Sequence, residues 1–292
     1  MRKIQIFANA KSVFSSFRRE FFVNSSAVFV FLGLVIFSAN TQAKQKSYLF
    51  ATPWYEAAGG RIRLAATKPS PSGSRDGVIE IVLKPGWKTY WRNPGNSGMA
   101  PSFSFDQKVF YEIFYPVPKL YETEDDWSFG YENRVMFPFR VSNSSKNLSG
   151  FLTLGLCNEI CIPLTLHFNF SPSVSKNEHL PVSLLKDAQS SLPDAANHEF
   201  EINATMNVNA LFIKIRNNKK TTPSSLFLDG GEMQIGPAKK INDNAEYTLF
   251  RAPVFSTQNR KNQTVFYVIS FNERAFSGTF KLRTPQANTP PL

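Results

Sequence analysis

Cysteine and histidine are both scarce in this sequence, and their scarcity excludes most metal and nucleophilic chemistry. The 292 residues include only two cysteines and three histidines. Two cysteines cannot form a disulfide-rich scaffold. The histidines, His167, His179 and His198, are scattered, which argues against a multi-histidine metal site and gives no Ser-His-Asp arrangement. The two cysteines therefore carry most of any functional argument.

Charged residues are also few, at 19% of the chain, and there is a single long apolar run near the N-terminus. The 28 phenylalanines exclude wholesale disorder, and the length suits two domains. The apolar run, Ala27 to Phe37, follows several basic residues and precedes Thr41-Gln42-Ala43, as in an export signal. It has about half of the roughly 20 residues needed to span a bilayer. We predict a signal peptide over 1–43, with a retained N-terminal anchor as the alternative.

The basic net charge does not indicate a nucleic-acid partner. Residues 1–43 hold five basic residues and one acidic residue, so their removal lowers the net charge from +11 to +7. The densest later cluster, Asn217-Asn218-Lys219-Lys220, is short and turn-like. A nucleic-acid footprint needs stronger clustering of bases, and we expect no nucleic-acid partner.

The region 47–172 alternates apolar and polar residues with the period of a β-strand. The pattern is clear in Arg61 to Ala65, more continuously apolar in Val78 to Leu83, and clear again in Leu164 to Phe170, where His167 falls on the polar face. Clusters of Gly, Pro, Asn and Ser separate the strands. This predicts an antiparallel sandwich, with His167 as a solvated strand residue.

A connector and a second region of alternation follow. Between Pro181 and Pro193, four apolar residues recur at helical spacing, which predicts a short helix packed on one domain; a partner-binding helix is the alternative. They are Leu184, Leu185, Ala188 and Leu192. Alternation returns over 196–286, as in Leu211 to Ile215 and Val265 to Phe271. The predicted fold class is all-β, with two sandwiches joined by a short helical linker.

Cys157-Asn158-Glu159-Ile160-Cys161 is the one constellation with chemical potential. In a straight strand the two Cα atoms would be roughly 13 Å apart, whereas a disulfide tolerates about 4.4–6.8 Å. A bridge therefore requires a bulge or a turn between the cysteines. A five-residue ring adds only about 2 kcal/mol of chain entropy, against almost 5 for a hundred-residue loop. The pair is thus a redox pair, a plain structural bridge, or two free or metal-binding thiols.

The sequence around the pair offers no local activation of either thiol. Glu159 lies between the cysteines, and no Lys or Arg falls between Gly155 and Pro163. A neighbouring carboxylate disfavours a thiolate. This suits a pair that is attacked by the activated thiolate of a partner. Two thiolates can also hold Cu(I), but no further Cys or His stands nearby in the sequence to complete a zinc site.

The motifs that surround the pair resemble a known family. They are Gly86-Trp87-Lys88-Thr89-Tyr90-Trp91-Arg92-Asn93-Pro94-Gly95, Tyr115-Pro116-Val117-Pro118, Phe129-Gly130-Tyr131-Glu132, Val135-Met136-Phe137-Pro138 and the cysteine segment up to Pro163. In this order they resemble the N-terminal periplasmic domain of DsbD-type thiol:disulfide interchange proteins, over about 55–170. The region 196–286 is more vaguely similar to the second β domain of ScsB-like relatives.

The resemblance implies an immunoglobulin-like sandwich in the periplasm whose cysteine pair relays electrons, as a thiol:disulfide oxidoreductase without a cofactor. The implied partners are a membrane-embedded DsbD/CcdA-like donor and periplasmic thioredoxin-fold oxidoreductases. Cys161 matches the cysteine that forms the mixed disulfide, and Cys157 matches the one that resolves it. In the family an aromatic cap loop shields the pair, so Trp127, Phe129 and Tyr131 are candidate shields, or alternatively ordinary loop aromatics.

This sequence departs from the family pattern in three ways. The cysteines are spaced as in the ScsB-like branch, Leu156 stands where relatives often have an aromatic residue, and neither a polytopic membrane region nor a CxxC domain is present. The resemblance implies that other polypeptides supply those parts, in cytochrome c biogenesis or copper tolerance. A non-enzymatic adaptor or copper-handling protein is the alternative function.

The aromatic and basic residues of the first motif have two readings. Trp87, Tyr90 and Trp91 beside Lys88 and Arg92 resemble a sugar or anion platform, or they are a strand end and a turn with the aromatics packed beneath. We favour the strand end. The expected organisation is then a signal peptide (1–43), a DsbD N-terminal-like domain (44–173), a linker helix (174–195), a second sandwich (196–286) and a disordered tail (287–292).

Overall fold

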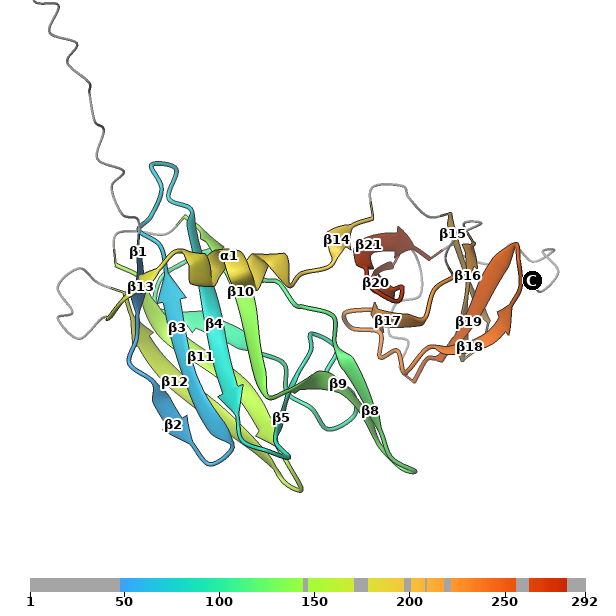
Figure 1. Ribbon diagram of the computed structural model, residues 1–292, viewed down its shortest axis with the longest axis horizontal. Coiled ribbons are helices and arrows are strands. Elements are labelled where there is room, and N and C mark those ends of the chain that lie inside the picture. Colours follow the sequence, from blue (N-terminus) through green and yellow to red (C-terminus); the bar gives the residue numbers. More distant parts are fainter. Residues whose placement is uncertain are drawn as a thin grey trace, which may run out of the picture. The chain divides into compact units, whose positions relative to one another are not determined.

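Four β-sheets build two β-sandwiches with a short helix between them (Figure 1). The computed structural model describes residues 48–143, 147–170, 178–196, 201–207, 209–217, 222–255 and 263–282. Residues 46–292 form one compact unit. The predicted all-β class with two sandwiches is therefore confirmed, whereas the predicted signal peptide and tail lie outside the described residues. Within the described residues no helix is long and apolar enough to cross a membrane.

The first sandwich pairs a seven-stranded sheet with a six-stranded one. The seven-stranded sheet runs β13-β1-β3-β4-β10-β7, with β2 on β3. Its strands are β1 (Tyr48–Ala51), β2 (Tyr55–Ala57), β3 (Gly60–Ala66), β4 (Arg75–Leu83), β7 (Phe110–Ile113), β10 (Arg134–Ser142) and β13 (Glu178–Pro181). The six-stranded sheet runs β12-β11-β5-β9-β8, with β6 on β11. Its strands are β5 (Lys88–Tyr90), β6 (Ser102–Phe105), β8 (Lys119–Glu122), β9 (Trp127–Glu132), β11 (Ser149–Cys157) and β12 (Cys161–Asn169).

The second sandwich consists of two four-stranded sheets. One runs β14-β21-β20-β17 and the other β15-β16-β19-β18. The strands of the first are β14 (Asp194–Ala195), β17 (Ser225–Asp229), β20 (Thr264–Ser270) and β21 (Ala275–Lys281). Those of the second are β15 (Ile202–Asn207), β16 (Ala210–Arg216), β18 (Lys239–Asp243) and β19 (Tyr247–Pro253).

The core lies where the alternation of apolar and polar residues predicted it. In β3, Ile62 and Leu64 are fully buried, while Arg61 is exposed. In β12, Leu166 and Phe168 are buried, and His167 between them is exposed. Because successive side chains of a strand point to opposite faces, each sheet turns its apolar face to the other sheet of its sandwich. The two apolar faces form the core.

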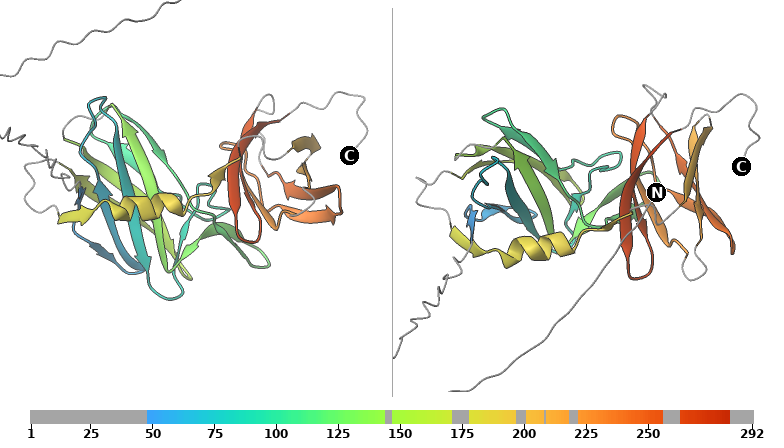
Figure 2. Two further views of the ribbon diagram at one scale, coloured as in Figure 1. Left: turned by 45° about the horizontal axis from the view of Figure 1, so that its top comes forward. Right: turned by 90° about the horizontal axis from the view of Figure 1, so that it is seen from above.

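The predicted linker helix is α1 (Ser183–Ser190), and it packs on the first sandwich. Leu184, Leu185 and Ala188 are its buried residues, and they join a small apolar cluster with Ala65 and Val78 of the seven-stranded sheet. The helix crosses the outer face of β4 and β10 (Figure 2). The prediction that this helix packs on a domain is confirmed. The strand β13 before it was not predicted.

One sheet of the second sandwich is buried on both of its faces. Alternate residues of β17 and β20, such as Leu226 and Ile269, lie in the core of the second sandwich. The residues between them, Phe227 and Val268, are also buried but belong to the core of the first sandwich. The second sandwich therefore has an apolar outer face, and this face is covered by the first sandwich.

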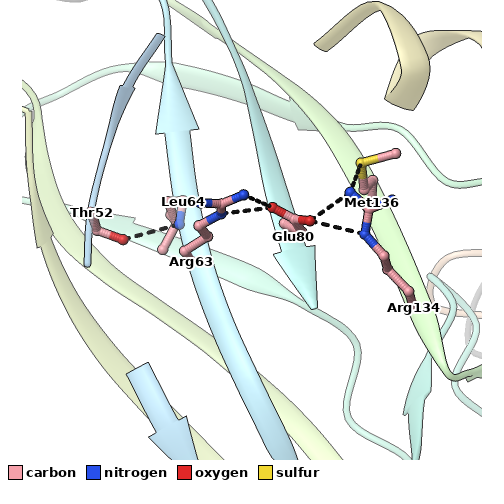
Figure 3. A network of polar contacts seen from close by, with 6 residues as sticks. All are labelled: Thr52, Arg63, Leu64, Glu80, Arg134 and Met136. Atoms are coloured by element: carbon pink, nitrogen blue, oxygen red, sulfur yellow. Dashed lines mark hydrogen bonds and ion pairs between the residues drawn. The ribbon is translucent and has the colours of Figure 1, made fainter. Parts of the chain in front are cut away.

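A buried carboxylate lies on the outer face of the seven-stranded sheet. Glu80 of β4 is 3% exposed and sits between two arginines from the neighbouring strands (Figure 3). Its Oε2 accepts a hydrogen bond from Nε of Arg63 at 2.7 Å, and its Oε1 accepts one from Nη2 of Arg134 at 2.6 Å. Burying a charge is costly unless it is paired and hydrogen-bonded. Glu80 is both ion-paired and hydrogen-bonded, and through these two arginines it links β3, β4 and β10.

We expect Glu80→Gln to lower the free energy of unfolding by about 2 kcal/mol, because the largely buried Arg63 and the half-exposed Arg134 then lose their counter-charge. Urea unfolding measures the loss. The matched control is Asp76→Asn on the same strand, whose ion pair with Arg140 at 2.7 Å is much more exposed and contributes at most about 1 kcal/mol. Equal losses from the two variants would contradict the assignment.

Candidate functional site

The two cysteines close a β-hairpin. Strands β11 and β12 pair from Ser149↔Asn169 to Cys157↔Cys161, and the three residues 158–160 form the loop. The Cα atoms of the two cysteines are 4.1 Å apart, and their sulfurs form a disulfide. The turn that the spacing required is thus the loop of a hairpin. The two cysteines are its last paired residues.

The two cysteines differ in their exposure to solvent. Cys157 is 5% exposed, because its strand is covered on the other side by β5, where Lys88 is its partner. Cys161 is exposed and begins β12, which is the edge strand of its sheet. In thiol–disulfide exchange a thiolate attacks one sulfur of the bond, and access decides which. Of the two cysteines, Cys161 is therefore the more accessible to an incoming thiolate.

A buried tyrosine hydroxyl contacts the exposed cysteine. The Tyr90 hydroxyl lies 3.0 Å from Sγ of Cys161, and because a disulfide sulfur carries no proton, the hydroxyl donates. Tyr90 is 1% exposed. Burial, and then the negative charge of Asp126, raise the pKa of Tyr90 to about 12. The hydroxyl therefore remains a neutral donor throughout the physiological pH range.

Glycines make room for the ring of Tyr90. A Cβ atom at Gly98 would lie 2.5 Å from Cδ1 of Tyr90, and one at Gly155 would lie 3.2 Å from Cε2. In the adjacent strand, Gly130 is the residue paired with Tyr90. Gly155 explains the unusual Leu-Gly-Leu stretch before Cys157. It is a glycine inside a strand, which is a known sign that another group approaches closely.

The surface next to Cys161 is apolar. Ile160 in the hairpin loop is 75% exposed, and Ile162, directly after the cysteine, is 39% exposed. Met99 is 40% exposed, and its carbonyl accepts a hydrogen bond from the backbone N–H of Gly155 at 3.1 Å. Single exposed apolar residues are common. Ile160 and Ile162 flank Cys161 directly in the sequence.

The three candidate shield residues lie in the core. Trp127, Phe129 and Tyr131 alternate along β9 and are 7%, 1% and 7% exposed. The ring of Phe129 contacts those of Trp127 and Trp91, and the Tyr131 hydroxyl donates to the carbonyl of Pro116 at 2.8 Å. The structure thus brings the two cysteines together and places these aromatics among core residues. Their shielding role stays a prediction.

Sequence reasoning did not identify Tyr90 as a neighbour of Cys161. The two residues are 71 positions apart, and their contact depends on β5 pairing beside β11. The available signals were the strand glycine Gly155 and the turn before β5. Gly86 in that turn has φ of +81°, and the N–H of Trp87 donates to the carbonyl of Lys84 at 3.1 Å. Pro-Gly at the centre of such a turn is typical of type II.

The rest of the first motif, from Trp91 on, is a strand end and a turn, which is the interpretation that we favoured from the sequence. Trp91 is fully buried, Arg92 forms an ion pair with Asp229 at 2.7 Å, and the side chain of Asn93 is hydrogen-bonded to backbone carbonyls of the second sandwich. These residues contact the protein's own second sandwich, and Trp91 presents no face to solvent.

The described residues contain no group of three or more Cys, His, Asp or Glu side chains that could hold a metal ion. The ring of His167 packs against Phe151 at 5.2 Å between centroids, and that of His179 against Tyr48 at 4.2 Å. His198 lies outside the described residues. His167 is thus a solvated strand residue, as the alternation predicted.

Comparison with known proteins agrees with this arrangement. The family model of the N-terminal domain of the thiol:disulfide interchange protein DsbD matches residues 63–170. The crystal structure of the N-terminal periplasmic domain of ScsB from Proteus mirabilis is similar to this chain, with a TM-score of 0.67 at 20% sequence identity. The match covers 80% of this chain and 98% of that one. No curated protein matches the sequence significantly. The first sandwich, with its Cys157–Cys161 disulfide, belongs to the DsbD N-terminal domain family.

Proposed function

We propose that this protein carries electrons between other proteins in the periplasm by thiol:disulfide interchange at Cys157 and Cys161. The observation that supports this most directly is the unequal exposure of the two cysteines: Cys161 is an exposed residue and Cys157 is 5% exposed. A staple formed for stability alone has no need of an accessible sulfur. The location rests on the predicted signal peptide and on the periplasmic domain to which the chain is similar.

The chemistry is a two-electron exchange in two steps. A membrane-embedded DsbD/CcdA-like dithiol donates first: its thiolate attacks Sγ of Cys161, the Cys157–Cys161 bond breaks, and Cys157 leaves as a thiolate. The donor's second thiolate then attacks the mixed disulfide at the donor's own sulfur. Cys161 is released as a thiolate, and the donor becomes a disulfide. The protein now holds a dithiol.

Delivery to the acceptor reverses these steps. The Cys161 thiolate attacks the disulfide of a thioredoxin-fold oxidoreductase and forms a mixed disulfide, and one acceptor sulfur leaves as a thiolate. Cys157 then attacks Sγ of Cys161 and releases the second acceptor thiolate, so that the Cys157–Cys161 bond forms again. The buried Cys157 always reacts inside the protein, at a distance that the hairpin fixes.

Tyr90 has a defined role in this scheme. Cys161 leaves as a thiolate when the oxidised donor departs, and it attacks as a thiolate when it meets the acceptor disulfide. A hydroxyl at 3.0 Å stabilises the anion more than the neutral thiol, because hydrogen bonds to charged groups are the stronger ones. Glu159, two positions before Cys161, disfavours a thiolate there. The hydroxyl supplies the activation that the cysteine segment itself lacks.

Cys157→Ser should trap partners on Cys161. The variant keeps the accessible thiol and removes the resolving one, so mixed disulfides accumulate and appear as higher-mass bands on non-reducing gels that vanish on reduction. Cys161→Ser is the matched control, and we expect little or no trapping because Cys157 is buried. Equal trapping by both variants, or by neither, would contradict the assigned roles.

The disulfide should be exchangeable in an ordinary redox buffer. We expect the pair to be half reduced at a potential above about −300 mV, since structural disulfides generally lie below that value. Equilibration with graded thiol buffers followed by thiol trapping measures the potential. A pair that stays oxidised well below this value would make the bridge a structural one and overturn the proposal.

Tyr90→Phe should make Cys161 a poorer thiolate. In the Cys157→Ser background we expect the pH midpoint of Cys161 alkylation to rise by about one unit, as the loss of a charge-assisted hydrogen bond at a partly exposed site predicts. Tyr121→Phe is the matched control: burial also raises the pKa of Tyr121 to about 12, but its hydroxyl has no hydrogen-bond partner among the described residues. An equal shift in both variants would argue against a specific contact.

A further inference from the structure

The chain passes directly from the redox site into the second sandwich. Tyr90 ends β5, and the next three residues each make a different contact with the second sandwich. Asn93 makes the most constrained one. Its side-chain amide donates to the carbonyls of Leu228 at 2.8 Å and Ile235 at 2.9 Å, and the residue is 9% exposed. Both amide protons are thus used, and the turn after β5 is fixed to two backbone segments.

Arg92 adds a charged contact beside Asn93. Its Nε donates to Oδ2 of Asp229 at 2.7 Å, and its guanidinium lies 4.3 Å from the ring centroid of Phe266. The other carboxylate oxygen of Asp229 accepts a hydrogen bond from the N–H of Gly231 at 3.0 Å. Asp229 is therefore held in place by its own sandwich. It orients Arg92 from the end of β17.

Trp91 supplies the apolar part of the contact. It is fully buried, and its ring lies 6.2 Å from that of Phe227 and 6.3 Å from that of Phe266. Its backbone N–H donates to the carbonyl of Phe129 at 2.9 Å, and the Phe129 ring lies 5.4 Å from that of Phe227. The second sandwich thus packs against β9 and against the residue that directly follows Tyr90 and β5.

The loop that follows returns to the ring of Tyr90. The Asn96 side chain accepts a hydrogen bond from Nε2 of Gln234 at 3.2 Å, so the second sandwich also contacts the loop. Two residues later, Gly98 lies against the Tyr90 ring. Residues 91–98 therefore leave Tyr90, bind the second sandwich, and come back to cover the same ring.

We propose that the second sandwich positions the redox site: by holding residues 91–96, it keeps the Tyr90 hydroxyl against Cys161. Asn93, Arg92 and Asp229 are positioning residues in this arrangement, since they act through Tyr90 and do not touch the sulfur. The inference rests on the proposed function for its biological meaning. Because coupling between two sites is reciprocal, the redox state of the pair should also alter how firmly the second sandwich is held.

The test measures Cys161 in the full-length Cys157→Ser protein by iodoacetamide alkylation across pH. We expect Asn93→Ala to raise the midpoint by about half a unit, which is about a threefold loss of thiolate below the midpoint. Asp229→Asn, which keeps the size of the side chain and alters only the second sandwich, should shift it in the same direction. If Asn93→Ala does not fold, Asp229→Asn alone tests the proposal.

A double-mutant cycle separates positioning from a general structural effect. In the presence of Tyr90→Phe, the change Asn93→Ala should produce no further shift, because the hydroxyl that it positions is already absent. Glu201→Gln is the control. It removes an exposed ion pair with Arg216, in the other sheet of the second sandwich, and should leave alkylation unchanged.

Two results would overturn the inference. The first is a fall in melting temperature in Asn93→Ala and Asp229→Asn with unchanged alkylation of Cys161. The second is a shift that adds fully to that of Tyr90→Phe. Alkylation needs no partner protein, so this outcome is independent of partner capture. If Cys157→Ser traps nothing while the coupling is present, the proposed electron transfer fails and the positioning stands.

Discussion

The short strand β5 is the element on which the arrangement of the site depends. It joins the cysteine hairpin to the other half of its sheet: it pairs with β11 at the single position Lys88↔Cys157, and with β9 along its whole length. Its last residue, Tyr90, contacts the exposed sulfur, and the residues that follow bind the second sandwich. The three residues of β5 and the three that follow thus connect the cysteine pair, the sheet and the second sandwich.

Much of the fold could be predicted from period-2 alternation, but the contact between the sandwiches could not. The alternation in β20 identified Val265, Tyr267 and Ile269 as core residues, and they are buried. The intervening Phe266 and Val268 are also apolar. A strand whose two faces are both apolar is buried on both sides, so the sequence did carry a signal for a second packed surface. It could not say which part of the chain covers that surface, because such long-range pairing leaves no local pattern.

The candidate site was predicted in part for a similar reason. Spacing required a turn between the cysteines, and a hairpin loop provides it. The three aromatic residues considered as shields show how far the sequence pattern could predict the site. Trp127, Phe129 and Tyr131 stand at every second position of one strand, and side chains with that spacing share a face. A face with three large aromatic residues is typical of a core, and here it is one. Tyr90, which contacts Sγ of Cys161, belongs to a strand far away in the sequence. The sequence signals for this contact were indirect, such as the glycine inside β11 that packs against the Tyr90 ring.

The hairpin can keep its structure when its disulfide opens, as the proposed exchange requires. A ring of five residues contributes only about 2 kcal/mol through chain entropy. The same two strands pair continuously from Ser149↔Asn169 to Cys157↔Cys161, and β11 is also flanked by β6 and β5. The backbone contacts hold the cysteines close together independently of the bond between them. We therefore expect reduction to change the chemistry of the sulfurs more than the fold, so that the two thiols remain close to each other.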